Sequence, residues 1–158
     1  MTAIDARPST LVVGLTNLIM RPLLRTPFGR VVRPLALLEF TGRRSGDRRR
    51  VVVGWHRDGT TAIVQTPARW RVNFDGGHPS TVYWCGKRHN LIGTLDTDAA
   101  RVAAALNAML ETGSSARSLA LRIPARHTLD DTDITRTNRA VIHFERTDTT
   151  SRSMSNNA

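Results

Sequence analysis

The chain has 158 residues, of which 40% are hydrophobic and 23% are charged. This length and composition are typical of one globular domain, and they exclude wholesale disorder and a pair of ordinary domains with a site between them. Twenty-three basic residues against thirteen acidic ones give a net charge of +10, and Lys87 is the only lysine. Residues 1–50 hold ten arginines against three acidic residues, so most of the excess lies in the first third. Such an excess attracts phosphate on a nucleic acid, an anionic membrane or a small molecule.

The N-terminal third predicts a helix followed by a basic segment. Apolar residues at helical spacing predict a helix over residues 10–21, which Pro22 ends. The run is too short to cross a bilayer, and it lacks the basic start and the cleavage site of a signal peptide. We therefore expect a cytoplasmic protein. Packing of this helix on its own domain is favoured, and peripheral association with an anionic membrane stays open.

The middle and end of the chain predict an antiparallel sheet. Strands are expected at residues 35–41, 48–57, 60–66, 80–85, 87–95 and 138–146, with turns at Asp58-Gly59 and Gly86-Lys87. No helix fits between residues 35 and 66, so a parallel sheet is excluded. Cys85, the only cysteine, lies in an apolar run and is expected in the core. One cysteine builds neither an intrachain disulfide nor a zinc cluster.

The helical elements are expected late in the chain. Asp98 is a good N-cap for a helix over residues 99–112, which Gly113 ends. A less regular helical piece is expected at residues 116–122 and irregular structure at 124–136. Consecutive hairpins, a helix and a returning strand predict a mainly β (α+β) fold, a small antiparallel barrel with flanking helices. The expected division is 1–33 for the N-terminal helix and basic segment, 34–146 for the barrel domain, and 147–158 for a disordered tail.

The most informative stretch is the arginine-rich turn between the first two expected strands. Residues 43–50 hold five arginines and one aspartate, and two glycines allow backbone N–H groups to converge on an anion. Side chains alternate along a strand, so Arg48 and Arg50 point to one face and Arg49 to the other. Two guanidinium groups beyond a Gly-Ser turn suit an elongated polyanion. A solvated basic hairpin tip is an equal alternative on composition alone.

Other chemistry is sparse. Trp70 fits either stacking on a planar ring or anchoring of the core. Arg69 and Arg71 lie on either side of it in the sequence and are expected to offer a cation near the same ligand. No histidines have metal-ligand spacing, and no serine lies in a nucleophile elbow. The acids Asp130, Asp131 and Asp133 fit helix capping or a solvated loop better than paired catalytic carboxylates. We expect no metal site and no catalytic side chain, so any chemistry would be carried by a bound organic cofactor.

Three features in order resemble a known family. Thr41-Gly42-Arg43-Arg44-Ser45-Gly46, followed by Arg48 and a valine-rich strand, resembles the phosphate-side motif of the deazaflavin-dependent nitroreductase family. Leu24–Arg30 is similar to the segment that precedes this motif, and Trp70-x-x-Asn73 with Pro79 resembles the family's Trp-x-x-Asn…Pro pattern. The resemblance covers roughly residues 20–145. It implies a split β-barrel that uses coenzyme F-420, an 8-hydroxy-5-deazaflavin with an oligoglutamate tail.

The resemblance also implies roles for single residues. Contacts to the phosphate and the tail are implied for Arg43, Arg44, Ser45, Gly46, Arg48 and Arg50. Contacts to the ring are implied for Val52 and Val53 along its face, for the backbone of Thr66, Pro67 and Ala68 at its edge, and for Trp70, with Arg69 beside it, closing the pocket.

The implied reaction is hydride transfer from the reduced cofactor to a quinone-like, nitro or other conjugated electron-poor acceptor. The protein would hold the reacting atoms about 3–3.5 Å apart. Residues 100–158 contain no Tyr or Trp, whereas the family's better-known nitroreductases place tyrosines over the substrate from this part. A quinone-like acceptor is therefore favoured over a nitroimidazole.

Two other classes of function stay open. One is a split barrel that binds FMN or another flavin, or that carries a cofactor without catalysis. The other is a basic module for a membrane surface or a nucleic acid. Only Trp70 among the eight aromatic residues has arginines on both sides, which disfavours base stacking, so no specific nucleic-acid partner is expected. The expected partner is a small-molecule electron acceptor, and the protein is expected as a monomer or a homodimer.

Overall fold

The computed structural model describes residues 4–5, 35–116, 119, 121–124 and 127–147. The predicted helix at 10–21, most of the basic N-terminal segment and nearly all of the expected tail lie outside this part of the chain.

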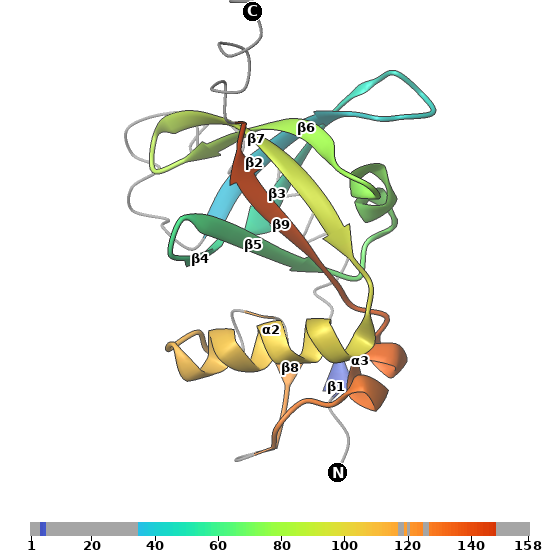
Figure 1. The fold of residues 1–158 in the computed structure, drawn as a ribbon, viewed down its shortest axis with the longest axis vertical. Coiled ribbons are helices and arrows are strands. Elements are labelled where there is room, and N and C mark those ends of the chain that lie inside the picture. The colour runs from blue at the N-terminus through green and yellow to red at the C-terminus, as the bar shows by residue number, and fades with distance from the viewer. Residues whose placement is uncertain (1–3, 6–34, 117–118, 120, 125–126, 148–158) are drawn as a thin grey trace, which may run out of the picture.

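A seven-stranded antiparallel sheet forms the body of the fold, in the order β3-β2-β6-β7-β9-β5-β4 (Figure 1). Its strands are β2 (Leu35–Thr41), β3 (Arg48–Gly54), β4 (His56–Asp58), β5 (Thr61–Thr66), β6 (His78–Trp84), β7 (Lys87–Asp96) and β9 (Ala140–Arg146). Only Trp55 separates β3 from β4, yet these strands lie at opposite edges of the sheet. The chain thus passes from one edge to the other and curls the sheet, which confirms the predicted mainly β, split-barrel fold.

Two predicted turns are displaced by one residue. Asp58 pairs with Thr61, so Gly59-Thr60 forms the loop between β4 and β5. Trp84 pairs with Lys87, which puts Cys85-Gly86 in the next hairpin loop with φ angles of 51° and 73°. Positive φ at both positions fits a type I′ turn, the geometry that matches the twist of the strands. The prediction of Cys85 as a core residue was therefore wrong, because the turn places its side chain at a half-buried position.

The barrel interior contains a continuous row of aromatic rings. Ring centroids are 5.7 Å apart for Trp70 and Phe40, 5.1 Å for Phe40 and Phe74, and 5.6 Å for Phe74 and Phe144. The row ends at Trp55, whose ring lies 5.4 Å from that of Phe144. Trp55 is 6% exposed, so its turn into the interior explains why one predicted strand is divided in two.

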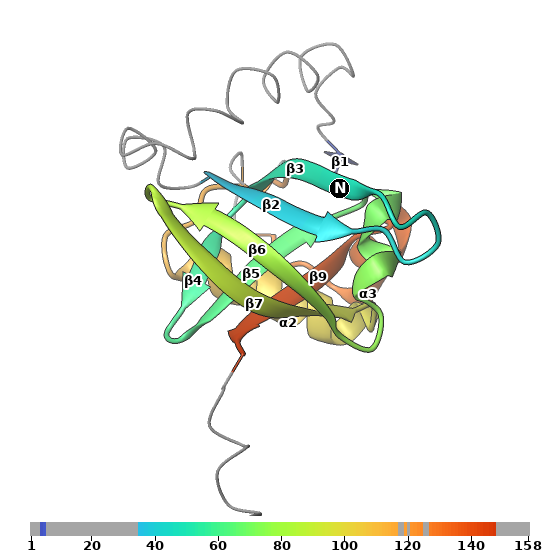
Figure 2. The ribbon, with the colours of Figure 1, turned by 90° about the horizontal axis from the view of Figure 1, so that it is seen from above.

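The two ends of the barrel carry different elements. Figures 1 and 2 both show the β4–β5 and β6–β7 hairpins at one end. At the other end lie the β2–β3 turn and η2, a 3-10 helix over Arg69–Phe74. The row of rings therefore leads from the η2 end to the hairpin end.

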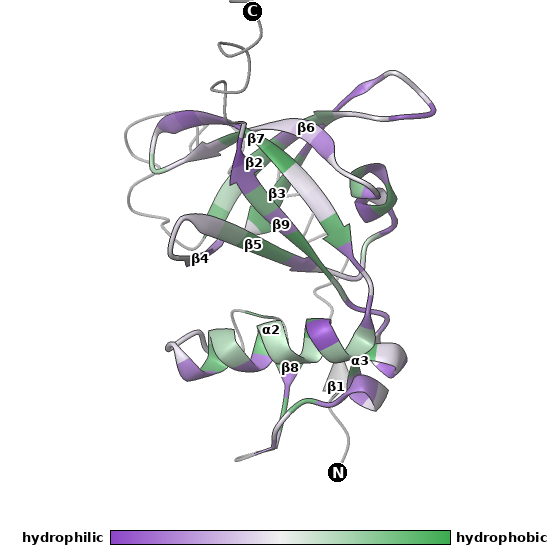
Figure 3. Ribbon diagram, viewed as in Figure 1, coloured by the Kyte–Doolittle hydropathy of each residue, from purple (hydrophilic) through white to green (hydrophobic). Residues whose placement is uncertain are grey.

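Helix α2 (Ala99–Glu111) covers one outer face of the barrel. Its buried residues, including Leu106, form a second apolar cluster with Ile63 of β5 and Val141 of β9. Figure 3 shows the matching hydrophobic colour along the middle of β5 and β9. The helix begins as predicted, with Asp98 accepting the Arg101 N–H at 2.9 Å.

A second helix, α3 (Asp131–Thr137), lies where irregular structure was expected at 124–136. It begins with a capping box. The Asp130 side chain accepts the Asp133 N–H at 2.9 Å, and Asp133 Oδ2 accepts the Asp130 N–H at 3.4 Å. The acidic cluster is therefore explained by capping, as predicted, although the short helix that it caps was missed.

A small two-stranded pair lies outside the seven-stranded sheet. It joins β1 (Ile4–Asp5) to β8 (Leu121–Arg122). The helical prediction for residues 116–122 was wrong at its C-terminal end, because the pairing partner β1 is distant in the sequence and leaves no local pattern. Within the residues that the structure describes, none of the helices has the length and apolar character needed to cross a membrane.

Candidate functional site

The arginine-rich turn between β2 and β3 is tightly closed. The Gly42 N–H donates to the Asp47 carbonyl at 2.9 Å, and the Gly46 N–H donates back to the Gly42 carbonyl at 2.9 Å. The Asp47 N–H donates to Ser45 Oγ at 3.2 Å. A Cβ atom at position 42 would lie 2.6 Å from Ser45 Oγ and 3.4 Å from Arg49 Nε, so a larger residue there would force the Ser45 side chain to shift. The Arg49 side chain therefore lies back along this turn.

A second set of hydrogen bonds ties the turn to η2. The Arg43 N–H donates to Asn73 Oδ1 at 2.9 Å, and Asn73 Nδ2 donates to the Trp70 carbonyl at 2.7 Å. Arg43 Nη2 also donates to the Gly77 carbonyl at 2.7 Å, with Nε 3.5 Å from His78 Nδ1. The two sequence motifs, thirty residues apart, are thus joined through one amide side chain. The guanidinium of Arg43, expected on the phosphate, is engaged in holding this arrangement.

Asn73 tests the link between the turn and η2. We expect Asn73→Ala to cost about 1 kcal/mol of folding stability, the usual value of one such hydrogen bond. Amide hydrogen exchange should become faster across Gly42–Gly46, because the turn loses its anchor. Urea unfolding and exchange mass spectrometry measure the two effects. Asn90→Ala is the control, since Asn90 loses only an exposed 3.3 Å contact with Thr81. Unchanged exchange in the turn would show that Asn73 does not hold it.

A groove of about 660 Å³ runs beside β3. It is lined by Arg48, Arg49, Arg50, Val51 and Trp70. Among the described residues β3 pairs with β2 alone, so the groove follows a free strand edge. Arg49 pairs with Phe40, and Arg48 pairs with Thr41 on the opposite face, which confirms the predicted alternation.

One of the three groove arginines is neutralised by an acid. Arg50 Nε lies 2.9 Å from Glu39 Oε1, and Glu39 is only 7% exposed. In the described part of the chain, no carboxylate forms an ion pair with Arg48 or Arg49. These two guanidinium groups therefore set the positive charge of the groove.

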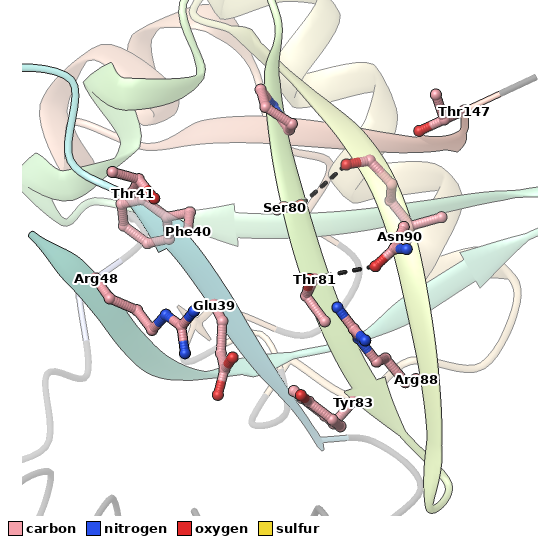
Figure 4. A pocket seen from close by; sticks show the side chains of 12 residues that line it. Glu39, Phe40, Thr41, Arg48, Ser80, Thr81, Tyr83, Arg88, Asn90 and Thr147 are labelled. Atoms are coloured by element: carbon pink, nitrogen blue, oxygen red, sulfur yellow. Dashed lines mark hydrogen bonds between the residues drawn. The ribbon is translucent and has the colours of Figure 1, made fainter. Parts of the chain in front are cut away.

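A polar hollow of about 510 Å³ adjoins the groove on the outer face of β2, β6 and β7. Arg48 borders both cavities. Figure 4 shows Arg48 on one side of the hollow and Arg88 on the other, with Glu39 and Thr81 between them. An elongated anion that leaves the groove past Arg48 would next meet Arg88.

The tip of the turn presents free backbone donors. Arg44, Ser45 and Gly46 are exposed. Within the described residues, the N–H groups of Arg44 and Ser45 donate to no acceptor. Two such groups next to each other form the kind of concavity that binds an anion.

The remaining predicted residues lie in two segments of the chain, in β3 and between β5 and η2. Val53 is buried in the barrel interior and Val52 faces the other side of β3, so the two do not share one surface. Thr66, Pro67 and Ala68 lead from β5 into η2, where the Ala68 N–H donates to Thr66 Oγ1 at 3.0 Å. This second segment lies directly before Trp70 in the chain.

The sequence did not predict Arg49 as a residue of the candidate site, and it wrongly predicted that Arg71 offers a free cation there. Arg49 shares its face of β3 with Val51, and both line the groove with Trp70. The sequence offered one indication of this position, because Arg49 alternates with Val51 and so lies on the same face of the strand. Arg71 was expected to offer a cation beside Trp70, but its guanidinium donates to the Thr66 carbonyl and to Asn138. Arg71 thereby joins the end of β5 to Asn138, the residue that ends α3.

A further cavity of about 540 Å³ lies between the C-terminal half of α2 and the sheet, and His56 is one of the residues that line it. Its Nδ1 lies 3.3 Å from Ser114 Oγ, and burial lowers the pKa of the imidazole. In the described chain, no three histidine, cysteine or acidic side chains are grouped closely enough to hold a metal ion.

The lowered pKa of His56 predicts acid-sensitive stability. Below pH about 6.5 the unfolded chain binds a proton at His56 before the folded chain does. Stability should therefore fall with pH from about 6.5 until the folded pKa is reached. His56→Gln should reduce this slope without removing it, because the pKa of His89 is also lowered, mainly by burial. Urea midpoints between pH 5 and 8 measure the slope, and an identical slope in the variant would contradict the assignment.

Comparison with known proteins supports the fold. No model of a protein family matches the chain, and no curated protein matches it. A solved structure described as a domain-swapped dimer is 15% identical, with a TM-score of 0.50 over 88% of this chain and 100% of its own. An FAD and heme binding protein from Mycobacterium smegmatis is 15% identical, with a TM-score of 0.44 over 90% of this chain and 67% of its own. An F-420 reductase is 15% identical, with a TM-score of 0.38 over 79% of this chain and 90% of its own.

Proposed function

We propose that this split barrel binds coenzyme F-420 along the free edge of β3 and acts as an oxidoreductase. The observation that carries the proposal is the groove itself. Arg48 and Arg49, unpaired with any described acid, line it together with Trp70. The turn that precedes β3 adds the N–H groups of Arg44 and Ser45, which have no described acceptor. A flat apolar surface next to concentrated positive charge fits a planar cofactor with a phosphate and carboxylates.

The residues present fit the three parts of this cofactor. The Arg44 and Ser45 N–H groups, with Arg49, would hold the phosphate. Trp70 would lie against the ring. The carboxylates of the tail would pass Arg48 and cross the outer hollow toward Arg88. Glu39, the one acid that lines the hollow, is neutralised by its ion pair with Arg50 of the groove, so it does not oppose an anion there.

When bound, the reduced cofactor supplies the hydride, and the chain supplies binding and orientation. Trp70 and Val51 would exclude water from one side of the ring. The guanidinium groups would hold the phosphate and the carboxylates and so orient the ring relative to the turn. We propose a conjugated, electron-poor acceptor of the quinone or nitro class, with quinones favoured, because the described part of residues 100–147 places no tyrosine or tryptophan over the groove.

FMN is the second candidate, since it offers the same ring and one phosphate. It would leave Arg48 and Arg88 without a ligand in the outer hollow. The experiment is a titration of the purified chain with F-420 and with FMN, followed by tryptophan fluorescence. We expect saturable micromolar binding of F-420 and at least tenfold weaker binding of FMN, with the quenching reduced in Trp70→Phe.

Two outcomes would overturn the assignment. Tighter binding of FMN, or an FMN mass in the purified protein, would replace the deazaflavin. The absence of saturable binding to either cofactor would remove the function. Oxidation of the reduced cofactor by a water-soluble quinone, measured by absorbance, separates an enzyme from a carrier that binds without turnover.

A further inference from the structure

A separate cavity of about 250 Å³ opens at the hairpin end of the barrel, away from the groove. It is lined by Trp55, Arg57, Thr60, Ala62, Trp84, His89, Leu91, Phe144 and Arg146. Drug-sized ligands occupy about 300–1,000 Å³, so this cavity suits a smaller molecule with a single ring. Two indoles and a phenyl ring provide its apolar walls.

Two residues of this lining, Trp55 and His89, each have a buried nitrogen atom for which the described residues provide no hydrogen-bond partner. Trp55 Nε1 and His89 Nε2 are shielded from solvent, and no described group forms a hydrogen bond with either. Trp55 is 6% exposed, so its N–H cannot reach bulk water. A buried donor without an acceptor costs about 1–3 kcal/mol, which is a reason to expect an acceptor from outside the chain.

The charges around the cavity have one sign. Arg57, Lys87 and Arg146 all act electrostatically on His89. The Arg57 guanidinium lies 5.5 Å from the centre of the Trp84 ring and donates to the Gly59 carbonyl at 3.0 Å. Among the described residues, none of the three cations is in an ion pair with an acid. The cavity therefore joins apolar walls, two unsatisfied nitrogens and uncompensated positive charge.

We propose that this cavity binds a small aromatic carboxylate. The ring of the ligand lies against Trp55 and Trp84. Its carboxylate accepts hydrogen bonds from the Trp55 Nε1–H and from His89 in its Nε2–H tautomer, and Arg57 and Arg146 balance its charge. The site lies at the opposite end of the barrel from Trp70 and is independent of the cofactor proposed above.

The test is a titration of the full chain with benzoate, followed by the indole N–H signals in ¹H–¹⁵N NMR spectra. Trp55→Phe assigns the Trp55 signal. We expect a saturable shift of this signal, whereas the Trp70 signal stays in place as an internal control. Benzamide, a neutral molecule of the same shape, should bind at least tenfold more weakly, because it lacks the charge that the cations compensate.

Matched variants test which positive charges contribute to benzoate binding. Arg57→Gln and Arg146→Gln should each weaken benzoate binding about tenfold, because each removes one of the two positive charges that balance the carboxylate. Arg122→Gln removes the same charge from an exposed position of β8 and should leave the affinity unchanged. Thermal unfolding of each variant establishes that it is folded.

Each contrary result overturns the proposal. Equal binding of benzoate and benzamide would show that the cavity does not recognise a carboxylate. If inorganic phosphate bound to the cavity as tightly as benzoate, the ring of the ligand would not contribute to recognition. A larger shift at Trp70 than at Trp55 would place the ligand in the groove, and the absence of any shift would remove the site.

Discussion

Arg49→Gln will lower the affinity for coenzyme F-420 by about 10- to 100-fold, the equivalent of one charge-assisted hydrogen bond of about 1.5–3 kcal/mol. The reason is its position. Arg49 lines the groove on the Trp70 side of β3 and lies back along the turn, in which the N–H groups of Arg44 and Ser45 have no described acceptor. The loss should be equal for cofactors with short and long oligoglutamate tails, because Arg49 would contact the phosphate.

Arg48→Gln is the matched variant one residue away. Arg48 borders the outer hollow that leads to Arg88, so it would contact the tail. Its loss should weaken long-tailed cofactor more than short-tailed cofactor. Fluorescence titrations with both cofactor forms at two salt concentrations compare the variants. The proposed path of the cofactor fails if Arg48→Gln and Arg49→Gln show the same dependence on tail length.

Gly93→Ala will destabilise the fold by about 3 kcal/mol, the upper range for overpacking of a close-packed interior. Gly93 faces the row of aromatic rings from β7. A Cβ atom there would lie 2.6 Å from Phe74 Cδ1 and 2.7 Å from Phe144 Cε1. Both rings are almost fully buried, so neither has space to move aside. Urea unfolding measures the loss.

A compensating substitution separates overpacking from other causes. Phe74→Leu alone should destabilise the barrel by opening a cavity. In the double variant with Gly93→Ala the leucine provides room for the new methyl group, so the combined loss should be smaller than the sum. Additive losses would show that the methyl group does not clash with this ring.

The sequence predicts the strands well where alternation and turn residues agree. β2 begins and ends as predicted, and α2 begins at its capping aspartate. Errors arise where a contact distant in sequence decides the structure. Trp55 divides a predicted strand because the barrel interior buries its ring, and the β1–β8 pair depends on residues near opposite ends of the chain. Cys85 occupies a left-handed turn position that its residue type does not favour.

Much less of the candidate site follows from the sequence. The sequence predicted a basic turn with glycines and a separate role for Trp70. In the structure, the Asn73 side chain joins the turn to the Trp70 carbonyl. Which guanidinium groups remain available depends on partners that sequence spacing does not reveal. Arg43 is bound to a carbonyl beyond η2, and Arg50 pairs with a buried acid of β2.

The position of β9 in the middle of the sheet has a consequence for biosynthesis. Before Ala140–Arg146 leave the ribosome, the nascent chain contains two separate sheet pieces, β3-β2-β6-β7 and β5-β4. β7 and β5 each expose a full strand edge at this stage, and such edges pair readily with other chains. The last strand closes both edges at once. Productive folding of the barrel therefore waits for synthesis of β9, and we expect a pause in translation before Ala140 to favour aggregation or capture by a chaperone.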